Sequence, residues 1–127
     1  MSAVGLISGG RDEHPSSSSR REHGVWTRLL APGEQVQDVF RLARTTLIFT
    51  GRRLILVEEA MSGRQVEYVS VPYRSITHFS VEAGGVFSPD ADLRIWLAGR
   101  TAPIEKSFGA DVDVYAVQAL LAQRLPG

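Results

Sequence analysis

Residues 53–71, RLILVEEAMSGRQVEYVSV, contain two runs of strand-forming residues separated by turn-forming residues. The first run, Arg53 to Glu58, is dense in branched apolar residues, whereas the second, Gln65 to Val71, alternates between apolar and polar positions. Because Met61-Ser62-Gly63 lies between the runs and favours a turn, the stretch predicts a β-hairpin. Pro72 follows and ends the second strand, since proline has no amide hydrogen to donate to a ladder.

Further strands are predicted on both sides of this hairpin. Stretches rich in β-branched and aromatic residues, with at least partial alternation, lie at Val36–Ala43, Thr45–Thr50, Ile76–Glu82, Leu93–Ala98 and Pro103–Phe108. The hydrophobic period then changes from two to that of a helix, with an apolar stripe at Val114, Val117, Leu121 and Leu125. About seven strands and one amphipathic helix are typical of a mainly β domain, a small barrel with the helix docked at an open end.

The two ends of the chain carry different signals. Residues 1–24 are rich in Ser and Gly and predict a flexible tail, so we place the domain at 25–127, beginning with a short helical stretch that contains Trp26, Leu29 and Leu30. Asp111 or Asp113 is expected to cap the C-terminal helix, because a short carboxylate accepts hydrogen bonds from the first free amides. The sequence shows no secretory signal pattern and no apolar run long enough to span a bilayer, so we expect a cytoplasmic protein.

Charge and cysteine content exclude several function classes. The 127 residues carry 14 Lys plus Arg against 14 Asp plus Glu, distributed as plus two over residues 25–58 and minus two over 59–127. Proteins that neutralise several phosphates of a nucleic acid usually have a strongly basic cluster, which this sequence lacks, so a nucleic-acid partner is not expected. The chain has no cysteine, so thiol catalysis and Cys-based zinc sites are impossible.

Several stretches are similar to a known family in order and spacing. They are Phe49–Val57, Val66–Ile76, Phe79–Glu82, Asp90–Gly99, Pro103–Lys106 and Asp111–Tyr115. From about Glu34 to Leu125 the sequence resembles the bacterial pleckstrin-homology-like (PH-like) domain family in its single-domain form. This resemblance implies a seven-stranded PH-like β-barrel capped by a C-terminal α-helix. It also implies cyclic homo-oligomers with rings of five, a polar surface between protomers that binds other proteins, and no enzymatic activity.

This sequence departs from the family at two places. The N-terminal segment is Ser-rich where relatives usually have a longer helix, and His78 lies where a basic residue is common. The strand alternation places Thr77, Phe79 and Val81 on one face, and Ile76, His78, Ser80 and Glu82 on the other, which is the polar face.

Trp96 and His78 are the candidate residues of an oligomer interface. Trp96 alternates with Leu93, Ile95 and Leu97 and therefore points away from the core. An outward tryptophan needs cover, which either the terminal helix or a neighbouring protomer can provide. A contact at the edge of a strand that closes by rotation would also cover exposed sheet edges.

No catalytic residues, metal ligands or cofactors are predicted. His14 and His23 lie in the expected tail, and His78 has no nucleophile with which to pair. Asp90 and Asp92 supply too few oxygen ligands for a calcium loop.

A second surface is a candidate for partner or anion binding and consists of Arg52, Arg53, Tyr73 and Arg74. Eukaryotic PH domains bind inositol phosphates through a basic first hairpin loop, but the corresponding turn here, Leu42 to Thr46, has no lysine cluster. The sequence therefore favours a non-catalytic module that binds itself and an unidentified protein partner. A peripheral module that binds anionic lipids or phosphoinositides is the alternative.

Overall fold

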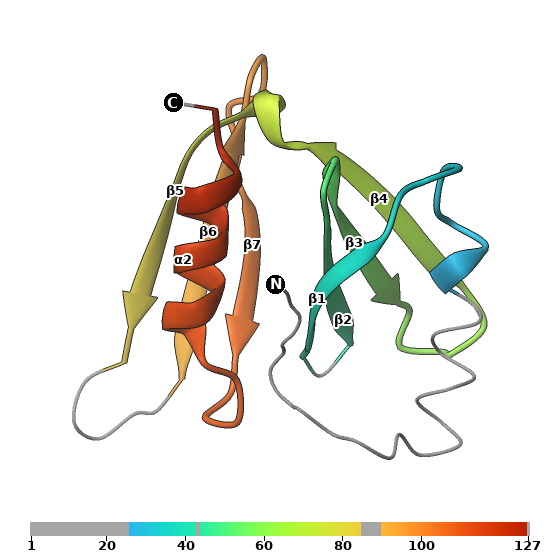
Figure 1. Cartoon of the computed structure of the whole chain (residues 1–127). Helices are drawn as coiled ribbons and strands as arrows, with labels where there is room; N and C mark the ends of the chain where they lie inside the picture. Colours follow the sequence, from blue (N-terminus) through green and yellow to red (C-terminus); the bar gives the residue numbers. More distant parts are fainter. Residues whose placement is uncertain (1–25, 43, 85–89, 127) are drawn as a thin grey trace.

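The seven strands form two antiparallel sheets that face each other across one core, as Figure 1 shows. The computed structural model describes residues 26–42, 44–84 and 90–126. The first sheet has the order β1-β2-β3-β4, from β1 (Val36–Arg41), β2 (Thr45–Thr50), β3 (Arg53–Glu59) and β4 (Val66–Pro72). The second sheet has the order β5-β6-β7, from β5 (Ile76–Ala83), β6 (Ala91–Leu97) and β7 (Ile104–Phe108).

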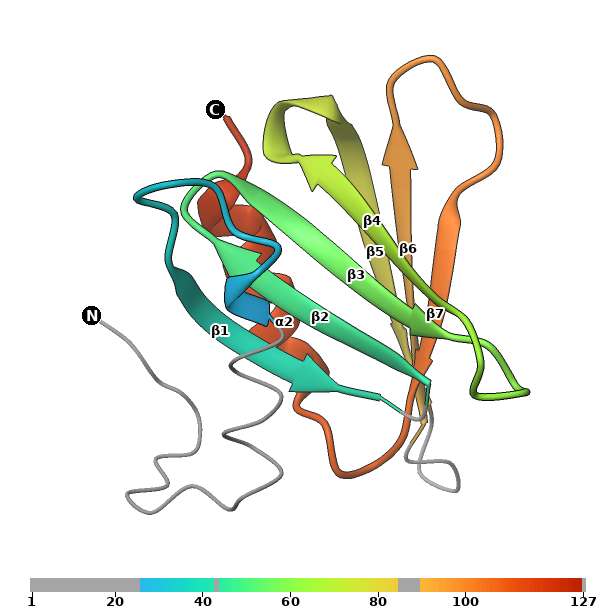
Figure 2. The ribbon, with the colours of Figure 1, turned by 90° about the vertical axis from the view of Figure 1, so that its right-hand side faces the viewer.

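The two sheets are connected by the short 3-10 helix η1 (Tyr73–Ser75) between β4 and β5. In the view of Figure 2 the strands of the first sheet run obliquely to those of the second. No hydrogen-bonded ladder joins the two sheets among the described residues, so the contact between them is made by side chains. The predicted seven-stranded, mainly β architecture with a C-terminal helix is confirmed.

The C-terminal helix α2 (Val114–Arg124) completes the core. Asp113 is its N-cap, and its carboxylate accepts hydrogen bonds from the amides of Tyr115 and Ala116 at 3.1 and 3.3 Å. Three buried side chains of the helix, Val114, Val117 and Leu121, belong to the same apolar cluster as residues of both sheets. The helix is therefore held by both layers rather than by one.

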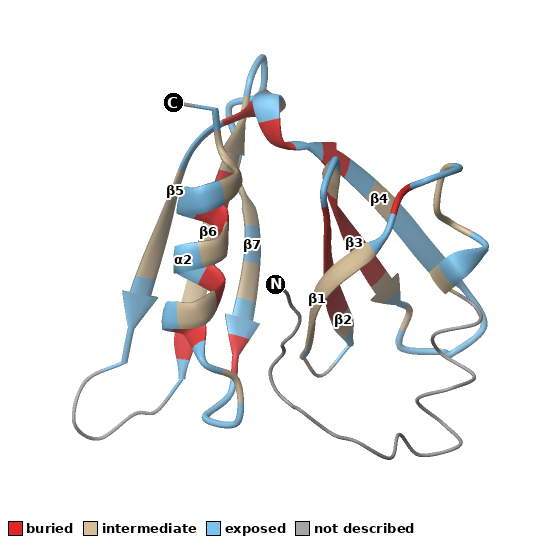
Figure 3. Ribbon diagram, viewed as in Figure 1, coloured by how far each residue is buried: buried red, intermediate tan, exposed pale blue. Residues whose placement is uncertain are grey.

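The central strands β2 and β3 are buried on both faces, as the dense red of Figure 3 shows. Their inner residues join the main core, whereas Ile48, Ile55 and Val57 form a second apolar cluster on the outer face. Residues 26–30 form a helical turn, and Trp26, Leu29 and Leu30 pack against this second cluster. Burial on both faces explains why Arg53 to Glu58 does not alternate like a strand with one wet face. The predicted tail, residues 1–24, lies outside the described residues.

Candidate functional site

The outer face of the second sheet carries the two residues proposed for an oligomer interface. Trp96 of β6 and His78 of β5 are directly opposite in the antiparallel ladder. Their rings stack with centroids 4.4 Å apart and planes inclined by 11°. His78 is exposed and Trp96 is half-buried, so the histidine covers only part of the indole.

A β-bulge sets this pairing. The register of β5 against β6 shifts between Ile76 and His78, which leaves Thr77 as an extra residue. The sequence pattern predicts Ile76 on the polar face with His78, and that prediction is wrong: Ile76 is 6% exposed and belongs to the core. Thr77, predicted on the same face as Phe79 and Val81, is exposed, and its hydroxyl donates to the Trp96 carbonyl at 3.2 Å.

Charged residues lie next to the stack on the same face of the second sheet. Arg94 donates from Nε to Glu105 at 2.6 Å and from Nη1 to Glu82 at 3.2 Å. Hydrogen bonding to Glu105, and then to Glu82, raises the pKa of Arg94. The Ser107 hydroxyl donates to the Asp92 carboxylate at 2.8 Å, and these two residues are opposite each other in β7 and β6. Three carboxylates thus share this face with one guanidinium, which gives it an acidic surplus.

The sequence left two possible covers for Trp96, the terminal helix and a neighbouring protomer. The terminal helix does not cover it. The buried residues of α2 pack with Leu93 and Ile95, which lie on the opposite face of β6. Trp96 therefore presents a partly covered aromatic ring on a polar surface, where protein interfaces concentrate aromatic residues.

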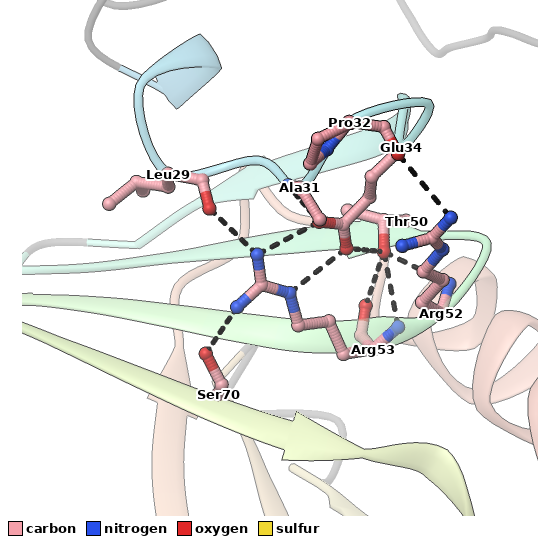
Figure 4. Close-up of polar contacts among 8 residues, drawn as sticks. All are labelled: Leu29, Ala31, Pro32, Glu34, Thr50, Arg52, Arg53 and Ser70. Atoms are coloured by element: carbon pink, nitrogen blue, oxygen red, sulfur yellow. Dashed lines mark hydrogen bonds and ion pairs between the residues drawn. The ribbon is translucent and has the colours of Figure 1, made fainter.

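Arg53, predicted on an exposed partner or anion surface, is half-buried and takes part in a polar network with Glu34, Leu29 and Ser70 (Figure 4). Its guanidinium binds both carboxylate oxygens of Glu34, from Nε at 2.9 Å and from Nη2 at 2.8 Å. It also donates to the Leu29 carbonyl at 2.8 Å and to the Ser70 hydroxyl at 2.6 Å. With these partners the side chain is committed to holding the fold, and the assignment of Arg53 to a free surface is corrected.

Glu34 is the residue of this network that the sequence analysis missed. Its side chain is 1% exposed and also accepts hydrogen bonds from the Thr50 hydroxyl at 2.7 Å and the Ala31 amide at 2.9 Å. The hydrogen bond from Arg53 lowers the pKa of Glu34 to about 2, against the opposing effect of burial. No local pattern marks this residue, because its cationic partner is 19 positions away.

Tyr73, another residue of the predicted partner or anion surface, is buried. It is 7% exposed, and its hydroxyl donates to the Thr50 carbonyl at 2.6 Å. Burial raises the pKa of Tyr73 to about 12. Tyr73, the first residue of η1, therefore contributes to the core and not to an exposed surface.

Arg52 and Arg74 are the members of the predicted anion surface that are exposed. Arg52 lies in the turn between β2 and β3 and donates to the Pro32 carbonyl at 3.4 Å. Arg74 lies in η1. Two arginines are fewer than the clusters of about four to eight basic residues that recognise anionic lipid surfaces.

The described residues contain no group of three or more His, Cys, Asp and Glu side chains that could hold a metal ion. His14 and His23 lie outside the described residues. No described helix is both long and apolar enough to cross a membrane.

Comparison with known proteins identifies this arrangement of two sheets and a helix. The bacterial PH domain family matches residues 16–125 of the chain. The chain belongs to the bacterial PH domain family. The PH-like domain family is generally non-catalytic.

This bacterial PH domain has close relatives in sequence and in structure. It is 36% identical to the uncharacterized protein YjqA of Bacillus subtilis over 121 residues, which cover 94% of the chain and 97% of the relative. The crystal structure of a pleckstrin homology domain from Shewanella amazonensis superposes with a TM-score of 0.76 at 30% identity, covering 91% of the chain and 94% of that protein. A DUF1696 family protein with a PH domain from Shewanella loihica gives a TM-score of 0.71 at 34% identity, covering 82% and 90%.

Proposed function

We propose that this bacterial PH domain is a non-catalytic, cytoplasmic interaction module that assembles as a ring-shaped homo-oligomer, with five protomers, and presents a polar surface to a protein partner. The observation that carries the proposal is the stacked pair Trp96 and His78 on the outer face of the second sheet. A half-buried tryptophan on an otherwise charged face is typical of an interface, because large aromatic side chains contribute much of the binding energy there.

Two further observations support assembly of identical copies. The net charge of the chain is zero, so copies packed side by side do not repel strongly. A ring requires two different surfaces on each protomer that meet head to tail, and the two sheets present different outer faces. The outer face of the second sheet is polar and acidic, whereas that of the first is largely apolar under residues 26–30.

Sedimentation velocity of the full chain tests this proposal. We expect a particle of five times the chain mass of 13.9 kDa, and dissociation to monomers when Trp96→Ala is introduced. Tyr115→Ser is the matched control, because Tyr115 is an aromatic residue of α2 that is 66% exposed and lies away from the stack. A wild-type monomer at high micromolar concentration would overturn the ring, and a Trp96→Ala protein that keeps the wild-type mass would exclude Trp96 from the interface.

The alternative function, binding to anionic lipids or phosphoinositides, rests on Arg52 and Arg74, since Arg53 is committed to Glu34. Co-sedimentation with vesicles that contain phosphatidylserine or a phosphoinositide distinguishes it from the main proposal. Binding that is lost in the double variant Arg52→Ala and Arg74→Ala would favour the alternative, and absence of binding to both vesicle types would remove it.

A further inference from the structure

One edge of strand β4 is not paired with any strand of the described residues. Its other edge pairs with β3. The Glu59 amide donates to the Arg44 carbonyl on the β2 side at 2.9 Å, so the opposed pair Glu59 and Val66 does not exchange backbone hydrogen bonds. Backbone direction alternates along a strand, so Val66, Tyr68 and Ser70 turn their amides and carbonyls away from β3. These groups are available to another strand.

Exposed apolar side chains are concentrated at the same hairpin. Of the four large apolar residues that are strongly exposed in the described part of the chain, three lie here: Met61 at 81%, Val66 at 43% and Tyr68 at 43%. Figure 3 shows the corresponding half of β4 as exposed. Tyr68 is opposite Val57, whose apolar cluster is covered further along by residues 26–30. The outer face at the β4 edge thus continues the apolar surface of Ile48, Ile55 and Val57, which residues 26–30 cover further along.

The carboxylates at the hairpin of β3 and β4 determine which kind of strand can add to the β4 edge. An open hollow of about 630 Å³ at this hairpin is lined by Glu58, Glu59, Ala60, Gln65, Val66 and Glu67. Glu58 is paired with Lys106 at 2.6 Å, whereas Glu59 and Glu67 are exposed and form no ion pair with any described residue. A basic partner would neutralise these two carboxylates. A second copy of β4 would add carboxylates to this edge instead of neutralising them.

We propose that the β4 edge binds an extended, basic segment of a partner protein, which adds to the first sheet as a fifth strand. Backbone hydrogen bonds to Val66, Tyr68 and Ser70 would hold the segment, as in other cases of strand addition. Residues that face Val66 and Tyr68 would be apolar, and those that face Glu67 would be Lys or Arg, because opposed side chains on one face contact each other. The inference rests on the proposed role in protein binding but not on ring formation.

The probe for this site is a short fluorescent peptide in which Arg alternates with Val and Thr. Fluorescence anisotropy with the full chain should show saturable binding. Replacing each Arg of the peptide by Glu should abolish it, and Glu67→Lys should weaken it by about fivefold to tenfold through loss of attraction and gain of repulsion. Asp111→Lys is the matched control, since Asp111 is an exposed acid outside this hairpin, and it should leave the affinity unchanged.

Two measurements separate strand addition from attraction between charges alone. A peptide with N-methyl groups on alternate amides keeps its charge but loses its donors, so it should not bind. Amide hydrogen exchange at Val66, Tyr68 and Ser70 should slow on binding, whereas Glu67 and Val69, which point toward β3, serve as internal controls. Equal binding of the methylated peptide, unchanged exchange at the three amides, or no binding up to millimolar peptide would each overturn the proposal.

Sedimentation of the same samples keeps this result distinct from the proposed ring. A ring that fails to bind the peptide would overturn the β4 site alone. A monomer that binds it would overturn the ring alone.

Discussion

Arg53 holds both carboxylate oxygens of Glu34 across 19 positions of sequence, at 2.9 and 2.8 Å. The same guanidinium donates to the Leu29 carbonyl, and the Leu29 side chain packs on the outer apolar cluster of the first sheet. This ion pair therefore fastens the segment before β1 to the beginning of β3. The segment in turn covers Ile48, Ile55 and Val57, so the ion pair also holds in place the apolar contact between this segment and the first sheet.

The ion pair of Glu34 and Arg53 makes the stability of the domain depend on pH in the acid range. The pKa of Glu34 falls from 4.5 to about 2 on folding, so the folded state holds the ionised form more tightly than the unfolded chain does. The stabilisation is fully present above pH 4.5 and is lost as the pH falls from 4.5 toward 2, by about 3 kcal/mol in total. Urea unfolding at a series of pH values measures this loss.

Glu34→Gln should remove this acid dependence and weaken the fold at neutral pH. The neutral amide leaves the Arg53 charge half-buried without a counter-charge, which costs about 2 to 3 kcal/mol of unfolding free energy. Glu59→Gln is the control, because Glu59 is exposed and forms no ion pair with the described residues, and it should change the unfolding free energy by less than about 0.5 kcal/mol. Equal effects of the two variants would show that the Glu34 pair does not stabilise the domain.

Tyr73→Phe should destabilise the domain by about 1 to 2 kcal/mol, because it leaves the Thr50 carbonyl without its side-chain donor in the core. The pKa of Tyr73 is raised to about 12, so its contribution is fully present below pH 10 and is lost as the pH rises through 12. Tyrosinate absorbance should show a step near pH 12 that is absent in the variant. If the variant instead lost absorbance from a step near pH 10, Tyr73 would titrate as an exposed phenol and the buried hydrogen bond would be contradicted.

Leu121→Ala tests whether α2 belongs to the core shared by the two sheets. Leu121 is fully buried, so the truncation leaves a cavity and should cost about 3 kcal/mol of unfolding free energy. Gln118→Ala changes an exposed position of the same helix and should stay within about 0.5 kcal/mol of the wild type. A loss below about 1 kcal/mol for Leu121→Ala would mean that the helix is only loosely attached to the sheets.

Local signals were enough to place most elements of this fold. The hairpin of β3 and β4 followed from Met61-Ser62-Gly63 and its flanking runs, and Gly63 does adopt a left-handed φ of 74°. Asp113 was one of two expected caps and is the one that accepts the helix amides. Such features depend on residues a few positions apart, so their physical causes are present in the linear sequence.

The sequence was a poorer guide to which face of a strand each residue occupies and to which residues form the candidate site. The bulge at Thr77 reversed the predicted orientation of Ile76, because one extra residue in a strand moves its neighbours to the other side of the sheet. Arg53 and Tyr73 looked like surface residues beside Arg52 and Arg74, but their partners Glu34 and Thr50 come from other strands or loops. Sequence spacing carries no information on such long-range contacts.

The sequence by itself determined the number and order of the strands, the C-terminal helix and the outward position of Trp96, since periodicity and turn residues act over short distances. Only the tertiary structure decided which charges are free. It buried Glu34 against Arg53, left Glu59 and Glu67 without ion pairs among the described residues, and stacked His78 on Trp96. The reason is that desolvation and ion pairing depend on which segments meet when the two sheets close over the core.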